Sequence, residues 1–268
     1  MQFKKSDFAP PILKRIIRYD FKYGWHGRYD DWDKVEKMAT GYDSKVILKR
    51  VSDAAMKVKT GQAVYERDAV EYHEIEVAYP LLSTLLWISS QNSNRLSVLD
   101  YGGSLGTSYR QNFPFLKHVS HLEWRIVEQE MFVTEGKEKF EDEHLHFHYD
   151  FEEAMNSFTV TPQLVMFSSS LPYLKNSYEV LSSVKASSVP YLFIDRTAFV
   201  DEPEDRLTIQ KVPPFFYEAS YPCWFFSKEK MYGFLNETYQ SVFHFKSGQV
   251  LNLGLQEIEY TGTLFKRK

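Results

Sequence analysis

The stretch Val98-Leu99-Asp100-Tyr101-Gly102-Gly103-Ser104-Leu105-Gly106 decides the fold of this 268-residue chain. Its first half is an apolar run typical of a buried β-strand, and its second half is a glycine-rich turn. Glycines allow positive φ and a close approach of the backbone to a ligand. The helix expected after the turn would offer free N–H groups to a carboxylate or phosphate. The stretch indicates a nucleotide-type cofactor, with an incidental Gly-Gly turn as the alternative.

Beyond this stretch, short apolar runs alternate with helical segments, which predicts a parallel sheet with helices on both faces. Five runs are predicted as strands: Leu96–Tyr101, Trp124–Glu128, Leu145–Tyr149, Leu164–Phe167 and Tyr191–Ile194. Helices are expected over Met131–Asp142 and over Asn176–Ser187, where Asn176 and Glu179 resemble a capping box. The predicted fold class is therefore α/β and Rossmann-like.

The C-terminal part has a different pattern. Three prolines are expected to break a Tyr- and Phe-rich loop: Pro213, Pro214 and Pro222. Ser227 is suited to cap a helix over Lys228–Asn236. Two strand-like runs, Ser241–Phe245 and Gln256–Phe265, follow with no helix between them. With the five earlier strands they predict a mostly parallel seven-stranded sheet that ends in an antiparallel hairpin.

The first 95 residues lack this alternation and are expected to form a mostly helical cap, with the Rossmann-like domain over residues 96–268. Apolar residues at helical spacing predict a helix over residues 47–58. A second such pattern covers residues 70–86, and Pro80 is expected to kink it. A helical cap of this kind would cover the cofactor and help to shape a substrate site.

An acid follows the second predicted strand at Glu128, 22 positions after Gly106. That is where a carboxylate can accept hydrogen bonds from the hydroxyls of a ribose. The spacing does not choose between cofactors, but the glycine pattern helps. A dinucleotide fingerprint needs G-x-G-x-x-G, whereas this chain has D-x-G-G-x-x-G, beginning at Asp100.

The stretch Val98–Gly106 resembles motif I of class I S-adenosylmethionine-dependent methyltransferases, which carries D-x-G-x-G-x-G after two apolar residues. The chain departs from that motif at Ser104, where the middle glycine is expected. The resemblance runs from Leu96 to the C-terminus and implies S-adenosylmethionine as the cofactor. It also implies a ribose contact at Glu128 and an adenine contact at Asp150. The full set of implied cofactor residues is Asp100, Tyr101, Gly102, Gly103, Ser104, Gly106, Glu128, Gln129, Asp150, Phe151, Ser168 and Ser169.

A narrower resemblance spans nearly the whole chain. It rests on Tyr23-Gly24-Trp25, Gly41-Tyr42-Asp43, Asp100-Tyr101-Gly102-Gly103, Asp195-Arg196-Thr197, Gln210-Lys211-Val212-Pro213-Pro214 and Tyr221-Pro222. Together these segments are similar to a bacterial family of methyltransferase-like proteins encoded among genes for surface polysaccharide (O-antigen or capsule) synthesis. This resemblance implies a glycan or a glycan precursor as the acceptor.

Transfer of a methyl group to a hydroxyl depends on positioning and on a general base. Asp195 and Arg196 follow the fifth predicted strand, at the edge of the sheet where ligands bind. Asp195 is a candidate base, and Arg196 is a candidate clamp for a phosphate or carboxylate of the substrate. The alternative is an Asp–Arg pair that only fixes the following loop. Tyr173 is a further candidate for the acceptor site, with simple packing as its alternative.

Two histidines of the cap, His26 and His73, are also candidate bases, although a lone histidine is more often an ordinary hydrogen-bonded residue. Gln210 and Tyr221 lie in the proline-rich segment and are candidates for binding the acceptor, again with packing as the alternative. Three histidines share one face of a predicted strand: His144, His146 and His148. No clear set of carboxylate partners accompanies them, so no metal is predicted.

The composition opposes several functions. A net charge of −4 is unlike that of a nucleic-acid-binding protein. The single cysteine, Cys223, excludes an internal disulfide and favours a reducing, cytoplasmic location. No apolar run is long enough to span a bilayer. Residues 1–21 are basic and amphipathic, and we expect them to dock on the domain itself or to rest on the inner face of a membrane.

The sequence thus predicts an S-adenosylmethionine-dependent O-methyltransferase that acts on a sugar or glycan precursor. One alternative is a nicotinamide-dependent sugar oxidoreductase or epimerase, which the glycine spacing and the lack of a Tyr-x-x-x-Lys dyad disfavour. A second alternative is a catalytically inert, methyltransferase-like scaffold.

Overall fold

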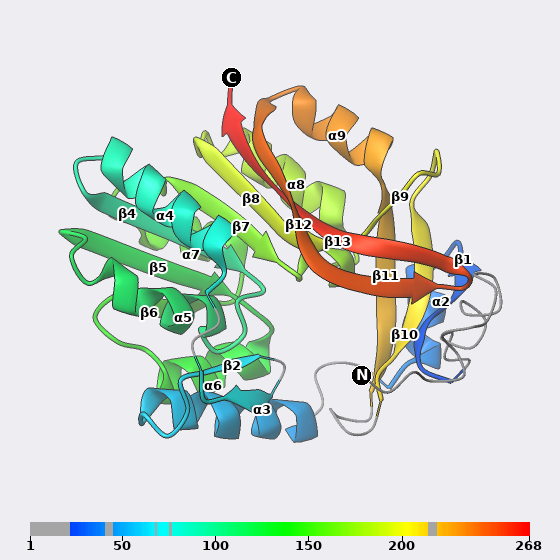
Figure 1. Ribbon diagram of the computed structural model, residues 1–268, viewed down its shortest axis with the longest axis horizontal. Helices are drawn as coiled ribbons and strands as arrows, with labels where there is room; N and C mark the ends of the chain where they lie inside the picture. Colours follow the sequence, from blue (N-terminus) through cyan, green and yellow to red (C-terminus); the bar gives the residue numbers. More distant parts are fainter. Residues whose placement is uncertain (1–21, 41–44, 68, 75–76, 214–218) are drawn as a thin grey trace, which may run out of the picture.

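A computed structural model describes residues 22–40, 45–67, 69–74, 77–213 and 219–268, and it confirms the α/β class (Figure 1). Eleven strands of the described chain form one sheet in the order β6-β5-β4-β7-β8-β13-β12-β1-β10-β11-β9, and β2 pairs with β3 separately. The strands are β1 (Gly24–Tyr29), β2 (Tyr65–Arg67), β3 (Val70–Tyr72), β4 (Arg95–Tyr101), β5 (His121–Val127), β6 (Leu145–His148), β7 (Leu164–Ser168), β8 (Tyr191–Thr197), β9 (Phe199–Val200), β10 (Arg206–Lys211), β11 (Ser220–Ser227), β12 (Tyr239–Leu253) and β13 (Gln256–Arg267).

The part of the sheet from β6 to β8 is parallel, and it contains all five strands predicted from apolar runs. After it, β13 lies between β8 and β12 and is antiparallel to both. Five parallel strands followed by an antiparallel pair are the arrangement that the class I resemblance predicts. The Rossmann-like methyltransferase fold is therefore confirmed for this part of the chain.

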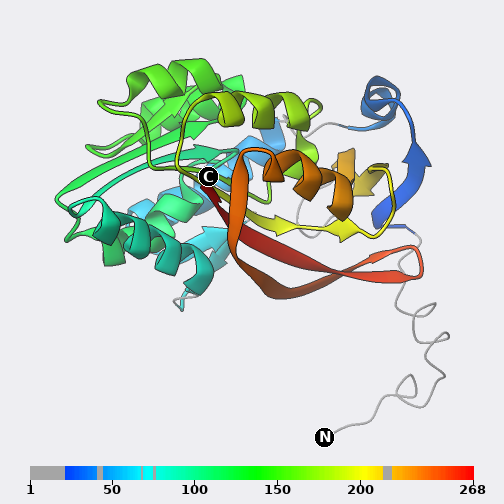
Figure 2. The same ribbon diagram turned by 90° about the horizontal axis from the view of Figure 1, so that it is seen from above.

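Helices cover both faces of the parallel strands (Figure 2). Side chains of α3, α4, α5 and α6 pack on one face, and those of α7, α8 and α9 pack on the other. The helices are α2 (Trp32–Met38), α3 (Lys45–Lys59), α4 (Tyr79–Gln91), α5 (Thr107–Leu116), α6 (Glu130–Lys139), α7 (Phe151–Ser157), α8 (Ser177–Ala186) and α9 (Lys228–Asn236), with a short 3₁₀ turn η2 (Leu171–Tyr173). Because both faces are covered, β7 is apolar up to its last residue and does not alternate, whereas β5 carries Glu123 and Arg125 on one face.

The N-terminal region contains strands as well as helices. The helix predicted over residues 47–58 is α3, but the one predicted over residues 70–86 is wrong in its first part, which forms β3 and a connection. Pro80 does not kink a helix. It lies in the first turn of α4, where a missing N–H breaks no intrahelical hydrogen bond.

The proline-rich loop predicted before Ser227 is also wrong in part, because β10 and β11 form an antiparallel pair there. Pro222 lies inside β11 opposite Ile209, and β9 pairs with β11 only at Phe226 and Ser227. The N–H that Pro222 lacks is therefore not needed for a hydrogen bond to β9. Strands β1, β10, β11 and β9 extend the predicted seven-stranded sheet to eleven strands, and Pro214 is outside the described residues.

The extension has a small core of its own. Trp32 and Val35 of α2 pack against Leu207 and Ile209 of β10. The rings of Trp32 and Trp224 stack with centroids 5.9 Å apart. Burial of these apolar side chains holds β10 and β11 in the sheet, since such burial contributes about 1.5–3 kcal/mol for each large side chain.

Two of the predicted helix starts can be compared with the structure. Ser227 caps α9 as predicted, because its hydroxyl accepts a hydrogen bond from Lys230 N–H at 3.3 Å. Asn176 is the N-cap residue of α8, but its side chain makes no capping hydrogen bond. No helix in the described parts of the chain has the length and apolar character needed to cross a membrane. Residues 1–21, for which a docked or membrane-bound helix is predicted, lie outside those parts.

Candidate functional site

The glycine-rich stretch forms the turn between β4 and α5. Gly102 and Gly106 have φ of +76° and +95°, in the region that favours glycine. Ser104 stands where the class I motif has its middle glycine, and it adopts a left-handed backbone too, with φ of +53°. That conformation costs a non-glycine residue about 1–2 kcal/mol. The turn therefore keeps a glycine-like path at Ser104 even though the residue has changed.

Asp100 is buried beneath this turn. Its Oδ2 accepts a hydrogen bond from Trp124 Nε1 at 3.3 Å. A Cβ added to Gly103 would lie 2.7 Å from the Asp100 carboxyl group, so the turn can close over this side chain only with glycine there. Burial raises the pKa of Asp100 to about 7, and the Glu128 carboxylate adds to the rise, while Trp124 and Arg196 oppose it. Asp100 supports the turn from below.

Glu128 follows β5 and contacts the turn from the neighbouring strand. The Ser104 N–H donates to Glu128 Oε1 at 3.2 Å, and the Gln129 N–H donates to Oε2 at 2.9 Å. Burial raises the pKa of Glu128, and these two hydrogen bonds oppose the rise. The predicted ribose-binding acid is therefore fixed beside the glycine-rich turn by two backbone donors.

Tyr101 lies between the turn and the predicted adenine contact. Its ring stacks on Phe167, with centroids 5.3 Å apart. Burial raises the pKa of its hydroxyl, and the Glu128 and Asp150 carboxylates raise it further, so both acids lie near this ring. Asp150 is exposed and caps α7, where its Oδ1 accepts from Glu153 N–H at 2.8 Å. Phe151 is half-buried at the start of α7.

The ends of β7 and β8 are joined by polar contacts. The Arg196 guanidinium donates to Ser168 Oγ at 2.7 Å, and the Arg196 N–H donates to Asp195 Oδ1 at 2.7 Å. The Ser169 N–H donates to the Asp195 carbonyl at 3.0 Å. Burial raises the pKa of Asp195, and the positive charge of Arg196 opposes the rise. These contacts fix the loop after β8 and also hold the Asp195 carboxylate at the edge of the sheet.

Three residues at this same edge have a left-handed backbone. Ser104, Ser169 and Arg196 follow β4, β7 and β8, and have φ of +53°, +66° and +46°. Such conformations cost about 1–3 kcal/mol each and cluster at binding sites. Ligands of α/β sheets also bind at the carboxyl ends of the parallel strands. The topology points to this edge of the sheet as the cofactor site, whereas positive φ alone does not, since Ser93, Asn94 and Ser188 adopt it before β4 and β8.

The hairpin formed by β2 and β3 reaches this edge from the N-terminal region. Thr107, the first residue of α5, donates a hydrogen bond from Oγ1 to Glu66 Oε1. The positive charge of Arg67 is a second contribution that opposes the rise in the pKa of Asp195, so this arginine lies near that carboxylate. Sequence reasoning missed these residues because no motif marks them and the region was expected to be mostly helical.

Three residues predicted near the acceptor meet beside the cofactor edge. The Tyr173 hydroxyl donates to Gln210 Oε1 at 2.8 Å, and the Tyr173 and Tyr221 rings pack edge to face at 5.3 Å. Gln210 is paired with Tyr221 across β10 and β11, and with Trp25 across β1. Directly opposed residues project from the same face of a sheet. Trp25, which the sequence did not single out, therefore shares this face with Gln210 and Tyr221.

The two candidate histidine bases lie elsewhere. His26 pairs with Ile209, one position along from Trp25, and so projects from the opposite face of β1. Its Nε2 bonds to the Tyr23 carbonyl at 3.0 Å. His73 is exposed after β3. Neither histidine meets the group formed by Tyr173, Gln210 and Tyr221.

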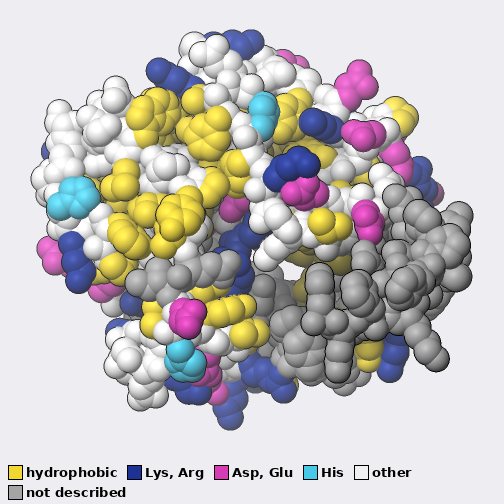
Figure 3. All heavy atoms as spheres, viewed as in Figure 1, with side chains coloured by type: hydrophobic (Ala, Val, Ile, Leu, Met, Phe, Trp, Pro, Cys, Tyr) yellow, Lys and Arg dark blue, Asp and Glu magenta, His cyan; other side chains and the backbone are white. Residues whose placement is uncertain are grey.

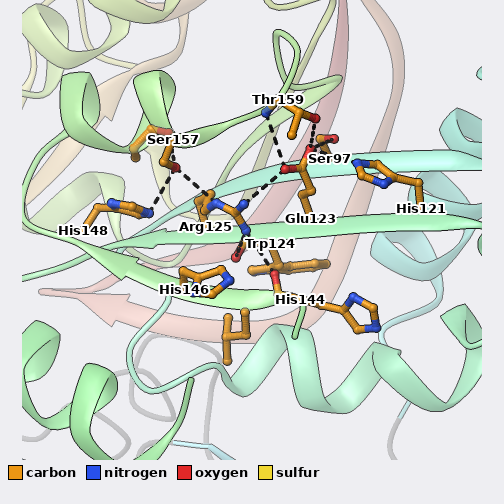
Figure 4. Close-up of polar contacts among 12 residues, drawn as sticks. Ser97, His121, Glu123, Trp124, Arg125, His144, His146, His148, Ser157 and Thr159 are labelled. Atoms are coloured by element: carbon orange, nitrogen blue, oxygen red, sulfur yellow. Dashed lines mark hydrogen bonds and ion pairs between the residues drawn. The ribbon is translucent and has the colours of Figure 1, made fainter. Parts of the chain in front are cut away.

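Two of the three histidines predicted on one strand face, His146 and His148, lie in β6, and Figure 4 shows His148 beside Ser157. His148 Nε2 lies 3.1 Å from Ser157 Oγ, while His146 Nδ1 lies 3.6 Å from a Glu141 carboxylate oxygen. Burial lowers the pKa of His148. The described residues contain no group of three or more His, Cys, Asp or Glu side chains placed to hold a metal. His146 and His148 therefore have polar partners within the chain.

No protein-family model matches the sequence, and the search of curated proteins finds no match. Among solved structures, a S-adenosylmethionine-dependent methyltransferase from Clostridium acetobutylicum ATCC 824 is 13% identical, with 80% of this chain and 97% of that chain covered and a TM-score of 0.44. Magnesium protoporphyrin IX methyltransferase from Synechocystis PCC 6803, solved with bound S-adenosylmethionine, is 10% identical, with 85% of this chain and 100% of that chain covered and a TM-score of 0.45. The N-terminal domain of EvdMO1, solved in the presence of S-adenosylhomocysteine and D-fucose, is 9% identical, with 84% and 97% covered and a TM-score of 0.47. At these identities the likeness concerns the fold.

Proposed function

We propose that this chain is a S-adenosylmethionine-dependent methyltransferase that methylates a hydroxyl group of a sugar or glycan precursor. The observation that carries the proposal is the hydrogen bond between Ser104 N–H and Glu128 Oε1. It joins the strained glycine-rich turn to the acid after the next strand, which are the two features that a ribose-bearing cofactor needs side by side.

The residues at this edge suit that cofactor, which supplies a methyl group on a positively charged sulfonium. Glu128 would accept hydrogen bonds from the ribose hydroxyls, and Asp150 would accept one from the adenine amino group. Gly103 leaves the turn free of a side chain that would collide with Asp100. The buried carboxyl groups around the turn favour a cationic ligand over an anionic one.

The acceptor is proposed to bind between this edge and the face formed by Trp25, Tyr173, Gln210 and Tyr221. Aromatic side chains with a few fixed polar groups are typical of sites for small organic ligands, and the narrower family resemblance favours a glycan. Asp195 is proposed as the general base, because its carboxylate lies at the carboxyl end of β8, where ligands of such sheets bind, and burial raises its pKa above the ordinary value of an aspartate. Its carboxylate would take the hydroxyl proton as the acceptor oxygen bonds to the methyl carbon and the carbon–sulfur bond breaks. Arg196 would clamp an anionic group, and a cytoplasmic location agrees with the buried thiol of Cys223.

Calorimetry with S-adenosylmethionine, S-adenosylhomocysteine and NAD(H) tests the proposal. We expect binding of the first two compounds and none of the third. Tight binding of NAD(H) alone would make the chain a nicotinamide-dependent oxidoreductase or epimerase. Failure of all three to bind would leave an inert methyltransferase-like scaffold.

A variant of Glu128 sharpens this test. Glu128→Ala removes hydrogen bonds to a charged group, worth about 1.5–3 kcal/mol, and should weaken S-adenosylhomocysteine binding about 10- to 150-fold. Glu130→Ala is the matched control, since it removes an exposed carboxylate two positions away in the first turn of α6. Equal affinities of the two variants would show that Glu128 does not hold the ribose.

A further inference from the structure

An apolar groove lies between α4 and β12. Its volume is about 510 Å³, which falls within the range of sites for small organic ligands, roughly 300–1,000 Å³. Its described lining carries no charge and includes Tyr79, Leu86, Phe243 and Phe245. Tyr79 is 72% exposed, and Figure 3 shows hydrophobic side chains gathered over this part of the surface. Contiguous apolar patches of this kind mark sites of interaction or ligand binding.

The groove lies level with the carboxyl end of β8. Phe245 of β12 pairs with Gly262 of β13, and the bulge of β13 at Gly262 lies opposite Asp195 and Arg196 of β8. Phe245 is therefore in line with Asp195, two strands away. Neighbouring strands lie about 4.8 Å apart, so the two backbones are separated by roughly 10 Å.

The groove is also on the same face of the sheet as the Asp195 carboxylate. Phe193 and Asp195 are two positions apart in β8, so their side chains project from one face. The ring of Phe193 stacks on that of Phe245, with centroids 5.6 Å apart. A side chain at Gly262 would collide with the Phe245 ring, so the glycine allows this ring to cross β13 towards β8. The wall of the groove thus ends beside Phe193, about 7 Å along the strand from Asp195.

The proposed acceptor face and the groove belong to one apolar cluster. Tyr173, Phe243 and Phe245 are half-buried against the same set of buried side chains, which includes Phe193 and Tyr221. A ligand that places a hydroxyl at Asp195 can therefore extend over β13 into the groove and stay on one side of the sheet.

We propose that the groove holds a hydrocarbon chain of the acceptor. The substrate is then an amphiphile, with a sugar hydroxyl at Asp195 and an alkyl or isoprenoid chain between α4 and β12. This inference rests on the proposed function, because it extends the acceptor site from the proposed base. The uncharged lining favours hydrocarbon over a further sugar or a phosphate, which would lose hydrogen bonds to water there. The lining residues of α4 run from Tyr79 to Leu86, about 10 Å of helix, which suits a chain better than a compact ring.

Calorimetry of the full chain with hexyl, heptyl and octyl β-D-glucoside below their micelle concentrations tests the groove. Each buried methylene should strengthen binding about two- to fourfold. Ser83→Glu places a carboxylate in the groove and should remove this dependence on chain length. Ser90→Glu is the matched control, because both serines are exposed on α4 and donate to the carbonyl three residues earlier. Affinity that does not change with chain length, or a dependence that Ser83→Glu keeps, would overturn the proposal.

Binding of S-adenosylhomocysteine to the same proteins separates the two proposals. We expect equal affinity for the unsubstituted chain and for both serine variants, because neither serine lies at the cofactor edge. Failure of this ligand to bind to all three would refute the proposed function, and the chain-length series would then still report on the groove by itself.

Photolabelling tests whether the groove leads to Asp195. Octyl glucoside with a diazirine on the sugar should label the peptide that contains Asp195, whereas a diazirine at the end of the chain should label α4 or β12. Mass spectrometry locates the labels. Labelling of the same peptides by both probes would overturn the proposal. So would a dimer in sedimentation velocity that Ser83→Glu dissociates, because the groove would then belong to an interface with a second copy.

Discussion

Asp100 allows a sharp test, because it is an ionisable group buried under the turn on which the proposed site depends. Replacement by asparagine keeps the size of the side chain and an oxygen that can accept the hydrogen bond from Trp124 Nε1. It removes only the ability to ionise. We expect Asp100→Asn to make the ligand-free protein more stable at high pH and to leave its stability unchanged at low pH.

The magnitude follows from the pKa, which rises from 3.8 to about 7, mainly because of burial. A shift of one unit corresponds to about 1.4 kcal/mol, so the rise corresponds to about 4 kcal/mol. Between pH 3.8 and 7 the folded protein holds a proton that the unfolded chain has lost, so its stability falls as the pH rises. Below this window Asp100 imposes no penalty, and above it the penalty is complete. The variant should therefore gain up to about 4 kcal/mol by pH 8.

Urea unfolding at pH values from 4 to 9 measures this gain as the difference in unfolding free energy between the two proteins. Taking the difference cancels the contribution from Asp195, whose pKa is also raised by burial. The charge of Glu128 helps to raise the pKa of Asp100, so that coupling is part of the measured difference. The exposed Asp201→Asn controls for the removal of one charge. A difference that stays constant over the whole pH range would refute the argument that Asp100 is desolvated beneath the turn.

Two further predictions concern the same turn. Ser104→Gly should raise the unfolding free energy by up to about 1 kcal/mol, because it relieves the left-handed backbone at φ +53°; a loss of stability in urea unfolding would contradict this. Gly103→Ala should lower the unfolding free energy by about 1–3 kcal/mol, since the new Cβ would lie 2.7 Å from the Asp100 carboxyl group. Gly233→Ala on α9 is its control: no atom lies within 4 Å of the new Cβ, and a gain of up to about 1 kcal/mol is expected. Similar losses for the two glycine variants would show that the close approach at Gly103 is unimportant.

The parallel half of the sheet could be predicted from the sequence because each strand is buried on both faces and reads as a short apolar run. The run Leu164–Phe167, for example, became β7 (Leu164–Ser168). The extension could not be predicted in this way. Gly24 pairs with Lys211, and Trp25 pairs with Leu253. Pairings between residues so far apart in the sequence leave no local pattern. Pro222 favours a loop when the sequence is considered alone, but packing between β10 and β11 places it in a strand.

The residues of the candidate site also fall into those that local sequence predicts and those that only the tertiary fold brings together. The turn and Glu128 were recognisable because a local motif and a fixed spacing carry them. Glu66 and Arg67 were not, because they reach the turn only through the tertiary fold of the β2–β3 hairpin. Trp25 is similar: its register with Gln210 places it on the proposed acceptor face, and no residue near it in the sequence indicates that position.

The hydrogen bonds of Glu128 also indicate what this carboxylate can still bind. An ionised carboxylate has about four positions at which it can accept a hydrogen bond. Two are taken by the N–H groups of Ser104 and Gln129, one on each oxygen. One position then remains on each oxygen, which suits a pair of neighbouring hydroxyl groups such as the 2′ and 3′ hydroxyls of a ribose. The backbone donors therefore orient the Glu128 carboxylate and leave half of its acceptor positions without a hydrogen bond. Two free positions favour a diol over a ligand with a single donor. The Ser104 N–H that orients Glu128 belongs to the strained turn. A different backbone path at Ser104 would therefore also reorient the Glu128 carboxylate. Variants that change the backbone at Ser104 should then weaken the ribose contact as well.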